Sequence, residues 1–153
     1  MDQQAIHYRR ARFSTRLPTD RRYTPWHFWL KLTPDGTWHI GFTSFAIRML
    51  GDLVEHGFNV KPGEMVNLGQ TVGWVEGFKA ITDLYAVAAG EFAGGNPAID
   101  QDITLIDSDP YGQGWLYSVR GQPDAHAIDA QAYAAILDAT IDRMKSEPDQ
   151  KNC

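Results

Sequence analysis

The stretch that decides the fold is Val72-Gly73-Trp74-Val75-Glu76-Gly77-Phe78-Lys79-Ala80-Ile81-Thr82-Asp83-Leu84-Tyr85. It is β-branched and aromatic on both sides of a short break, which predicts a β-hairpin. Gly77 stands two residues before Lys79 and can adopt backbone angles that other residues resist. We therefore expect Lys79 at the hairpin tip, with its ammonium in water and its backbone held rigidly. A modifying enzyme needs this arrangement to select one lysine among many.

Turn signals divide the flanks of this hairpin into similar strand-turn units. Gly63 and Gly69 precede the lysine, and Gly90 follows it. Short strands separated by glycine and proline are typical of an antiparallel barrel or sandwich. We therefore predict a mainly β fold with short helices.

Elements before the central hairpin are predicted from their own local signals. Alternating residues at 28–32 and the segment 38–42 indicate two strands, joined by the turn signal at 34–37. Thr43 or Ser44 is suited to cap a short helix that ends at Gly51.

A C-terminal helix is predicted after Asp129, which is suited to cap it. One apolar face is expected to pack against the barrel, with residues at helical spacing: Tyr133, Ile136, Leu137, Ile141 and Met144. Residues 96–106 indicate a short helical connection, and 116–119 a last strand.

Composition limits the classes of protein that need to be considered. The chain has 153 residues, of which 43% are hydrophobic, which fits one globular domain. No apolar run approaches the roughly 20 residues of a membrane-spanning helix, and we expect a cytoplasmic protein without a membrane partner. The single cysteine, Cys153, excludes an internal disulfide and a cysteine-based metal cluster.

Charge is distributed unevenly along the chain. Residues 1–22 hold six arginines against two aspartates, whereas residues 23–153 hold 8 basic and 17 acidic residues. The acidic body argues against nucleic-acid binding, which needs clustered Lys and Arg. The expected organisation is a flexible Arg-rich extension at 1–16, one domain at 17–145 and a flexible tail at 146–153. A transit peptide or an RNA-contacting arm is the alternative for the extension.

Three spaced segments resemble one family. Glu76-Gly77-Phe78-Lys79-Ala80 is similar to the Glu-x-x-Lys-Ala segment of glycine-cleavage H-like proteins, which have the lipoyl/biotinyl-attachment fold. Residues 17–24 resemble the beginning of that domain. Pro110-Tyr111, followed by Gly114-Trp115, resembles the run that leads into its last strand. The resemblance covers residues 17–145 and implies a flattened barrel-sandwich hybrid with a C-terminal helix.

The resemblance implies a non-catalytic carrier that holds lipoate in amide linkage to Lys79. A lipoate ligase or a lipoyl/octanoyl transferase would load it, and a dihydrolipoamide dehydrogenase-like enzyme would act on the arm. Glu76, Phe78 and Asp83 are expected to contact the loading enzyme or the arm. We expect a monomer with no metal site.

The segment Trp26-His27-Phe28-Trp29 departs from the family pattern. H-proteins usually read Ser/Glu-His-Glu-Trp here, and their polar residues, with an aspartate at the position of Asp83, are associated with holding the aminomethylated arm. Carboxylates suit a cationic amine through charge-assisted hydrogen bonds, so Trp26 and Phe28 indicate another load. His27 and Phe28 are expected near the docked arm.

Together with the variant sequence around Lys79, these departures resemble the lipoate-binding proteins of the sulfur-oxidising heterodisulfide-reductase-like (sHdr) system. That branch implies heterodisulfide-reductase-like partners and sulfur-bound cargo or electrons. A glycine cleavage H protein that carries an aminomethyl group is the alternative.

Other functions fit the sequence less well. A Schiff-base lysine needs a desolvated pocket, which a hairpin tip does not offer. Biotin sites usually place methionine on both sides of the lysine, where this chain has Phe78 and Ala80. The five histidines do not fall at a ligand spacing. An unmodified structural subunit is the remaining alternative.

Overall fold

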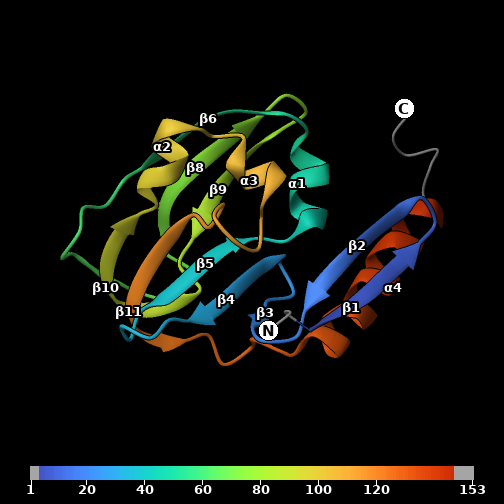
Figure 1. The fold of residues 1–153 in the computed structure, drawn as a ribbon, viewed down its shortest axis with the longest axis horizontal. Coiled ribbons are helices and arrows are strands. Elements are labelled where there is room, and N and C mark those ends of the chain that lie inside the picture. The colour runs from blue at the N-terminus through green and yellow to red at the C-terminus, as the bar shows by residue number, and fades with distance from the viewer. Residues whose placement is uncertain (1–3, 147–153) are drawn as a thin grey trace.

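The computed structural model of the protein describes residues 4–146 as two packed β-sheets, with a β-hairpin and the C-terminal helix beside them (Figure 1). The larger sheet has the order β3-β4-β5-β11-β10-β7, and the smaller has the order β6-β8-β9. All recorded strand pairs are antiparallel. The predicted mainly β fold with short helices is confirmed.

The strands of the larger sheet are β3 (Arg22–Tyr23), β4 (Phe28–Leu32), β5 (Trp38–Phe42), β7 (Met65–Val66), β10 (Ala88–Gly95) and β11 (Tyr117–Pro123). Those of the smaller sheet are β6 (Leu53–Phe58), β8 (Thr71–Gly77) and β9 (Ile81–Tyr85). The predicted strands at 28–32 and 38–42 are confirmed, as is the central hairpin, whose ladder pairs Glu76 with Ile81.

The main core lies between these two sheets. Successive residues of a strand point to opposite faces, so Phe28 and Leu30 of β4 enter this core, whereas Trp29 enters a second one. Trp29 pairs with Gly41 on β5, where a Cβ would lie 2.5 Å from the indole ring. Gly41 is therefore required for the tryptophan to lie flat on the sheet.

Three short helices cover one end of the sheets: α1 (Ser44–Leu50), α2 (Pro97–Gln101) and α3 (Leu105–Ser108). Thr43 caps α1 by accepting a hydrogen bond from the backbone N–H of Ala46, as the sequence predicts. Gly51 ends the helix with φ 76°, and its N–H donates to Ile47. A left-handed residue at this position favours glycine.

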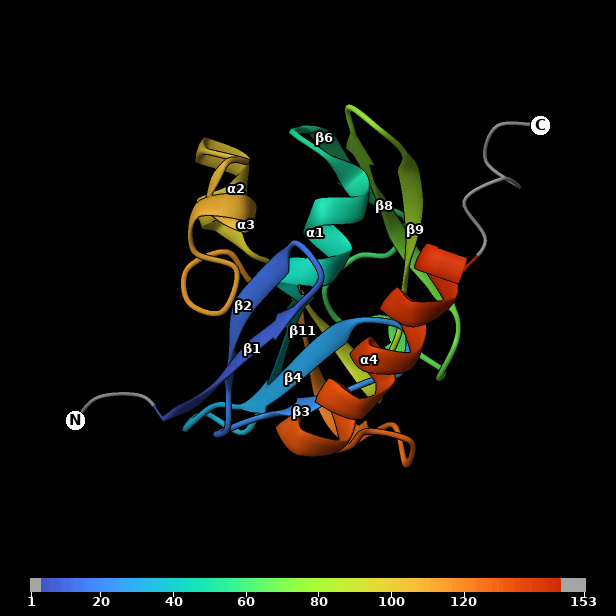
Figure 2. The same ribbon diagram turned by 90° about the vertical axis from the view of Figure 1, so that its right-hand side faces the viewer.

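The N-terminal segment differs from the predicted flexible extension. Residues 5–18 form a hairpin of β1 (Ala5–Arg10) and β2 (Phe13–Pro18), and the expected boundary at residue 17 lies inside β2. The hairpin packs on α4 (Ala130–Ser146), as Figure 2 shows. The Tyr8 hydroxyl donates to Asp138 at 2.8 Å, and Arg10 makes two hydrogen bonds to Asp142.

The second core joins this hairpin to α4 and to the outer face of β3 and β4. Its apolar residues include Tyr8, Phe13, Leu17 and Leu137. Of the predicted apolar face of α4, Tyr133, Leu137 and Ile141 are buried in this core and Met144 packs against it, whereas Ile136 is half-buried and not part of it. The helix packs against β1 of the hairpin as well as β3 of the larger sheet. An arginine-rich segment is ordered here because its alternate residues are apolar and α4 covers them. The tail expected at 146–153 lies outside the described residues except for Ser146, which ends α4.

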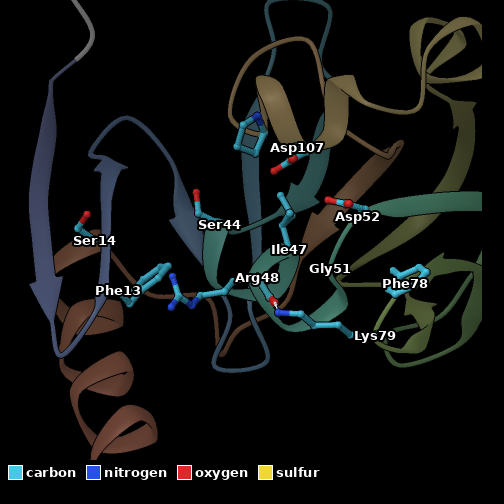
Figure 3. A pocket seen from close by; sticks show the side chains of 11 residues that line it. Phe13, Ser14, Ser44, Ile47, Arg48, Gly51, Asp52, Phe78, Lys79 and Asp107 are labelled. Atoms are coloured by element: carbon cyan, nitrogen blue, oxygen red, sulfur yellow. Dashed lines mark hydrogen bonds between the residues drawn. The ribbon is translucent and has the colours of Figure 1, made fainter.

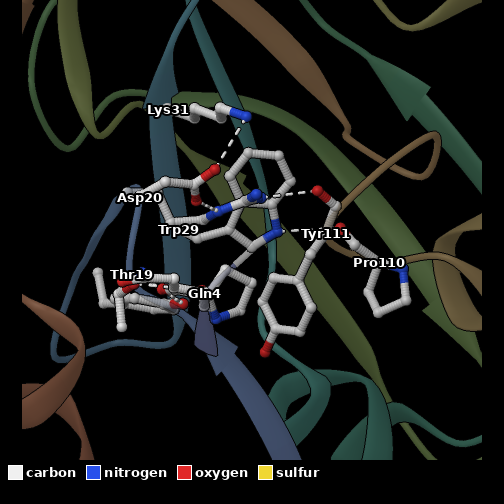
Figure 4. Close-up of polar contacts among 10 residues, drawn as sticks. Gln4, Thr19, Asp20, Trp29, Lys31, Pro110 and Tyr111 are labelled. Carbon is white, nitrogen blue, oxygen red and sulfur yellow. Dashed lines mark hydrogen bonds and ion pairs between the residues drawn. The ribbon is translucent and has the colours of Figure 1, made fainter. Parts of the chain in front are cut away.

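A buried arginine, Arg21, links the chain before β3 to Trp29 and Tyr111 of the second core; Figure 4 shows Trp29, Pro110 and Tyr111. The Arg21 guanidinium lies 4.6 Å from the centre of the Trp29 ring and donates to the carbonyl of Tyr111 at 2.7 Å. It also pairs with Asp20, which in turn contacts Lys31. The Trp29 indole donates to the carbonyl of Pro110. The Pro-Tyr segment noted in the sequence therefore closes over the same tryptophan.

Replacing Arg21 by alanine is expected to lower the free energy of unfolding by about 2–3 kcal/mol, because the substitution removes ring stacking and leaves a buried carbonyl unpaired. Arg22 is the matched control, since its side chain is exposed, and Arg22→Ala should change stability by less than about 0.5 kcal/mol. Urea denaturation followed by tryptophan fluorescence measures both. Equal effects would contradict a structural role for the contacts of Arg21 with Trp29 and Tyr111.

Candidate functional site

Lys79 lies at the tip between β8 and β9, as predicted. The tip residues Phe78, Lys79 and Ala80 are exposed, and the Phe78 side chain is 85% exposed. The turn is closed by a hydrogen bond from the backbone N–H of Gly77 to the carbonyl of Ala80, at 2.8 Å. The lysine amine is therefore accessible to a large enzyme.

This tip is clamped against the end of α1. The backbone N–H of Lys79 donates to the carbonyl of Leu50 at 2.8 Å, and that of Phe78 donates to Asp52 at 2.7 Å. A Cβ on Gly77 would lie 2.2 Å from the Leu50 carbonyl oxygen. Only glycine allows this close approach, so the local sequence before the lysine is what lets the tip dock.

The side chain of Lys79 follows the same helix end. Its Nζ donates to the backbone carbonyl of Arg48 at 3.5 Å. The C-terminal turn of a helix presents unpaired carbonyl groups and attracts cations. Gly51 leaves space for the lysine stem, since a Cβ there would lie 2.8 Å from Lys79 Cγ.

Helix α1 separates two open grooves beside the tip. The first, which we call the apolar groove, has a volume of about 390 Å³. Residues lining it include Trp26, His27, Phe28, Met49, Ile81 and Asp83. Asp83 is the one acidic residue among those that line this groove, and its side chain is exposed.

The second groove, which we call the hairpin groove, lies between α1 and the N-terminal hairpin and has a volume of about 500 Å³. Residues lining it include Phe13, Ser14, Ile47, Arg48, Phe78 and Lys79. Figure 3 shows the Lys79 side chain running toward Arg48, with Phe13 beyond it. The Arg48 guanidinium lies 5.8 Å from the centre of the Phe13 ring.

His27 is a neutral group at the base of the apolar groove. Burial lowers its pKa to about 4. Its Nδ1 lies 2.8 Å from the hydroxyl of Tyr133, which donates its proton to Thr43 Oγ1. Nδ1 therefore carries the ring proton and donates it to Tyr133, which leaves Nε2 as an acceptor. The residue adopts φ 77° in the turn between β3 and β4.

The residues expected from the sequence divide between the two grooves. His27, Phe28 and Asp83 line the apolar groove together, although they come from separate segments. Lys79 and Phe78 line the hairpin groove, and Glu76, half-buried on β8, lines neither.

Sequence reasoning misses Arg48 and Phe13 as groove residues. Arg48 is one surface residue of a short helix, and Phe13 falls in a segment for which the sequence predicts flexibility. Gly51 is predicted as the end of a helix, but no local sequence pattern predicts its contact with Lys79.

A lipoyl group fits this arrangement. An exposed primary amine on a rigid tip suits an acylating enzyme, and each adjoining groove is within the range of about 300–1,000 Å³ that holds small organic groups. Within residues 4–146, no cluster of three or more histidine, cysteine or acidic side chains is arranged to hold a metal ion. No helix in that part of the chain is both long and apolar enough to span a bilayer.

Comparison with known proteins gives a consistent result. The family model "Glycine cleavage H-protein" matches residues 21–139. A glycine cleavage system H protein of Cronobacter sakazakii is 36% identical over 127 residues, which cover 80% of this chain and 96% of the relative. One of Corynebacterium jeikeium is 37% identical over 126 residues, covering 79% and 97%.

A solved structure is also similar. The crystal structure of a glycine cleavage system H protein from Mycobacterium marinum superposes with a TM-score of 0.71 at 40% sequence identity. The match covers 78% of this chain and 97% of that protein. The hairpin of β1 and β2 lies outside the residues matched by the family model.

Stability should fall on acidification because His27 must remain neutral in the folded state. Its pKa is lowered from 6.5 to about 4, so the unfolded chain binds more protons between those values and folding weakens as pH falls below 6.5. From pH 7.5 to pH 5 the loss due to His27 is on the order of 2 kcal/mol.

His27→Asn is the matched variant, because asparagine tolerates the left-handed backbone and does not titrate. Burial also lowers the pKa of His39, which contributes a slope of the same sign in both proteins. The comparison therefore uses the difference between the two urea-unfolding pH profiles. Parallel profiles would contradict a neutral, half-buried His27.

Proposed function

The chain belongs to the glycine cleavage H-protein family, and on this premise we propose that Lys79 carries lipoate and passes an aminomethyl group between the enzymes of a glycine cleavage system. Members of the family are non-catalytic carrier subunits with covalent lipoate on a lysine. The observation that carries the proposal is the exposed lysine on a tip clamped to α1. The names of the relatives support the glycine cleavage assignment.

Lipoate supplies two sulfur atoms that take up and release a load by thiol–disulfide exchange. The protein chain fixes the point from which the lipoyl arm extends. Because the backbone at Lys79 is fixed by Leu50 and Asp52, the arm begins from one place and presents its load at a high effective concentration to each partner. The partners proposed for this cycle are a lipoate ligase or transferase, a dihydrolipoamide dehydrogenase and the glycine cleavage enzymes.

The apolar groove is suited to shelter the loaded arm. Its aromatic and aliphatic walls exclude water, and Asp83 offers a carboxylate to a cationic amine. His27 adds a neutral acceptor because Nδ1 is engaged with Tyr133. Asp83 and His27 thus provide two of the contacts that an aminomethyl load would use.

The residues of the same groove favour a second candidate function. Trp26 and Phe28 stand where family members usually carry polar or acidic side chains, and both line the groove here. Neither side chain is acidic, so among the residues that line the groove Asp83 has no second carboxylate beside it to bind an ammonium. The alternative is therefore a carrier of sulfur-bound cargo or electrons in an sHdr-like pathway, with heterodisulfide-reductase-like partners.

Intact mass measures the modification directly. After expression in cells supplied with lipoate, the wild-type protein should gain one lipoyl group, and Lys79→Arg should gain none. Lys61→Arg is the matched control, because Lys61 is also an exposed lysine at a turn. It should load as the wild type does. Since Lys79 is exposed, neither variant should shift the melting temperature appreciably. Loading of Lys79→Arg would contradict the site.

A transfer assay separates the two kinds of cargo. Lipoylated protein is incubated with labelled glycine and the decarboxylase of a glycine cleavage system, and the label retained on the protein is counted. The aminomethyl proposal predicts retention in the wild type and roughly tenfold less in Asp83→Asn, equivalent to about 1.4 kcal/mol of lost charge pairing. A wild-type protein that is loaded with lipoate but takes no label would favour the sulfur carrier.

A further inference from the structure

The two faces of α1 open into different grooves. Ile47, Arg48 and Gly51 line the hairpin groove, whereas Met49 and Leu50 line the apolar groove. This follows from helical geometry, because residues three and four apart share one face. Lys79 itself lines the hairpin groove, so the lysine has access to a site on the side of α1 away from His27 and Asp83.

We propose that the hairpin groove is a second docking site for the lipoyl arm and that it holds the oxidised arm when no cargo is attached. The inference rests on the proposed lipoylation of Lys79 and adds a place where the arm is stored. The apolar groove would then serve the loaded arm.

The direction of the lysine stem is the first argument. Gly51 leaves room for Lys79 Cγ, and the contact from Nζ to the Arg48 carbonyl leads the side chain into the hairpin groove. Acylation removes the charge of Nζ but keeps one N–H. The amide can therefore still donate to the Arg48 carbonyl, and the attached chain continues in the same direction.

The walls of the groove are the second argument. Phe78, which is exposed, offers apolar surface to a hydrocarbon chain and its sulfur-containing ring. Phe13 and Ile47 also line the groove, but their side chains are nearly buried. The Arg48 guanidinium lies over the ring of Phe13. The carboxylates that line the groove, Asp52 and Asp107, are exposed, so an uncharged arm need not displace their water.

The origin of one wall is the third argument. Phe13 and Ser14 belong to β2, which precedes the residues matched by the family model. The hairpin is held in place from behind by α4 through Tyr8 and Arg10. An addition to the family domain is thus fixed so that one of its aromatic side chains faces the carrier lysine across a groove.

A cysteine trap tests the docking. Ser14→Cys is made in a Cys153→Ser background, and the lipoylated protein is incubated at mildly alkaline pH. The introduced thiolate attacks one sulfur of the oxidised ring, the ring S–S bond breaks, and formation of the new disulfide releases an arm thiolate that iodoacetamide caps. Val54→Cys in the same background is the control, because Val54 is exposed near the tip and is not among the lining residues of either groove.

Mass spectrometry of the peptides should find at least about tenfold more cross-link in the Ser14→Cys variant than in the Val54→Cys variant, because docking raises the local concentration of the ring. Equal capture would overturn the docking proposal. Absence of any lipoyl mass would instead contradict the proposed function, so the two failures are distinguishable.

Nuclear magnetic resonance provides a second test. It compares the wild-type protein before and after lipoylation. Lipoylation should shift the Arg48 Nε–H signal and leave that of the exposed Arg143 unchanged. Shifts confined to the Trp26 indole and the Met49 methyl group would overturn the proposal, because both residues line the apolar groove.

Discussion

The docking of the β8–β9 tip on the C-terminus of α1 is the constraint on which the site depends. Two backbone hydrogen bonds, to Leu50 and Asp52, and the close approach of Gly77 fix where Lys79 begins. Helix α1 also lies between the two grooves. The helix therefore anchors the backbone at Lys79 and keeps the apolar groove apart from the hairpin groove. A carrier needs this combination, because the arm moves while its origin does not.

The two grooves differ in the chemistry that they offer. The apolar groove combines aromatic walls with Asp83 and a neutral His27, whereas the hairpin groove has Arg48 beside Phe13. Trp26 and Phe28 add aromatic surface to the first groove. Family membership indicates a lipoyl carrier, and the two proposed cargoes differ in the charge that they require of these side chains.

Local patterns in the sequence are enough to predict the central hairpin, the capped helix α1 and the apolar face of α4. Each depends on residues close together in the chain, such as Gly77 beside Lys79 or Thr43 before α1. The N-terminal hairpin cannot be predicted in this way, because its order comes from contacts of Tyr8 and Arg10 with residues 130 or more positions away. The grooves are equally inaccessible, since His27 and Asp83 meet only through the tertiary fold.

The pairing of the N-terminal hairpin with α4 has a consequence for how the protein is made. The hairpin of β1 and β2 shares its core with α4, so the second core closes only after α4 has been synthesised. The backbone hydrogen bonds that clamp the lysine tip involve none of that helix. A truncated chain that lacks α4 would keep the attachment point and lose the packing that holds Phe13 against its groove. The surroundings of Lys79 thus depend on α4, which is synthesised long after the lysine itself.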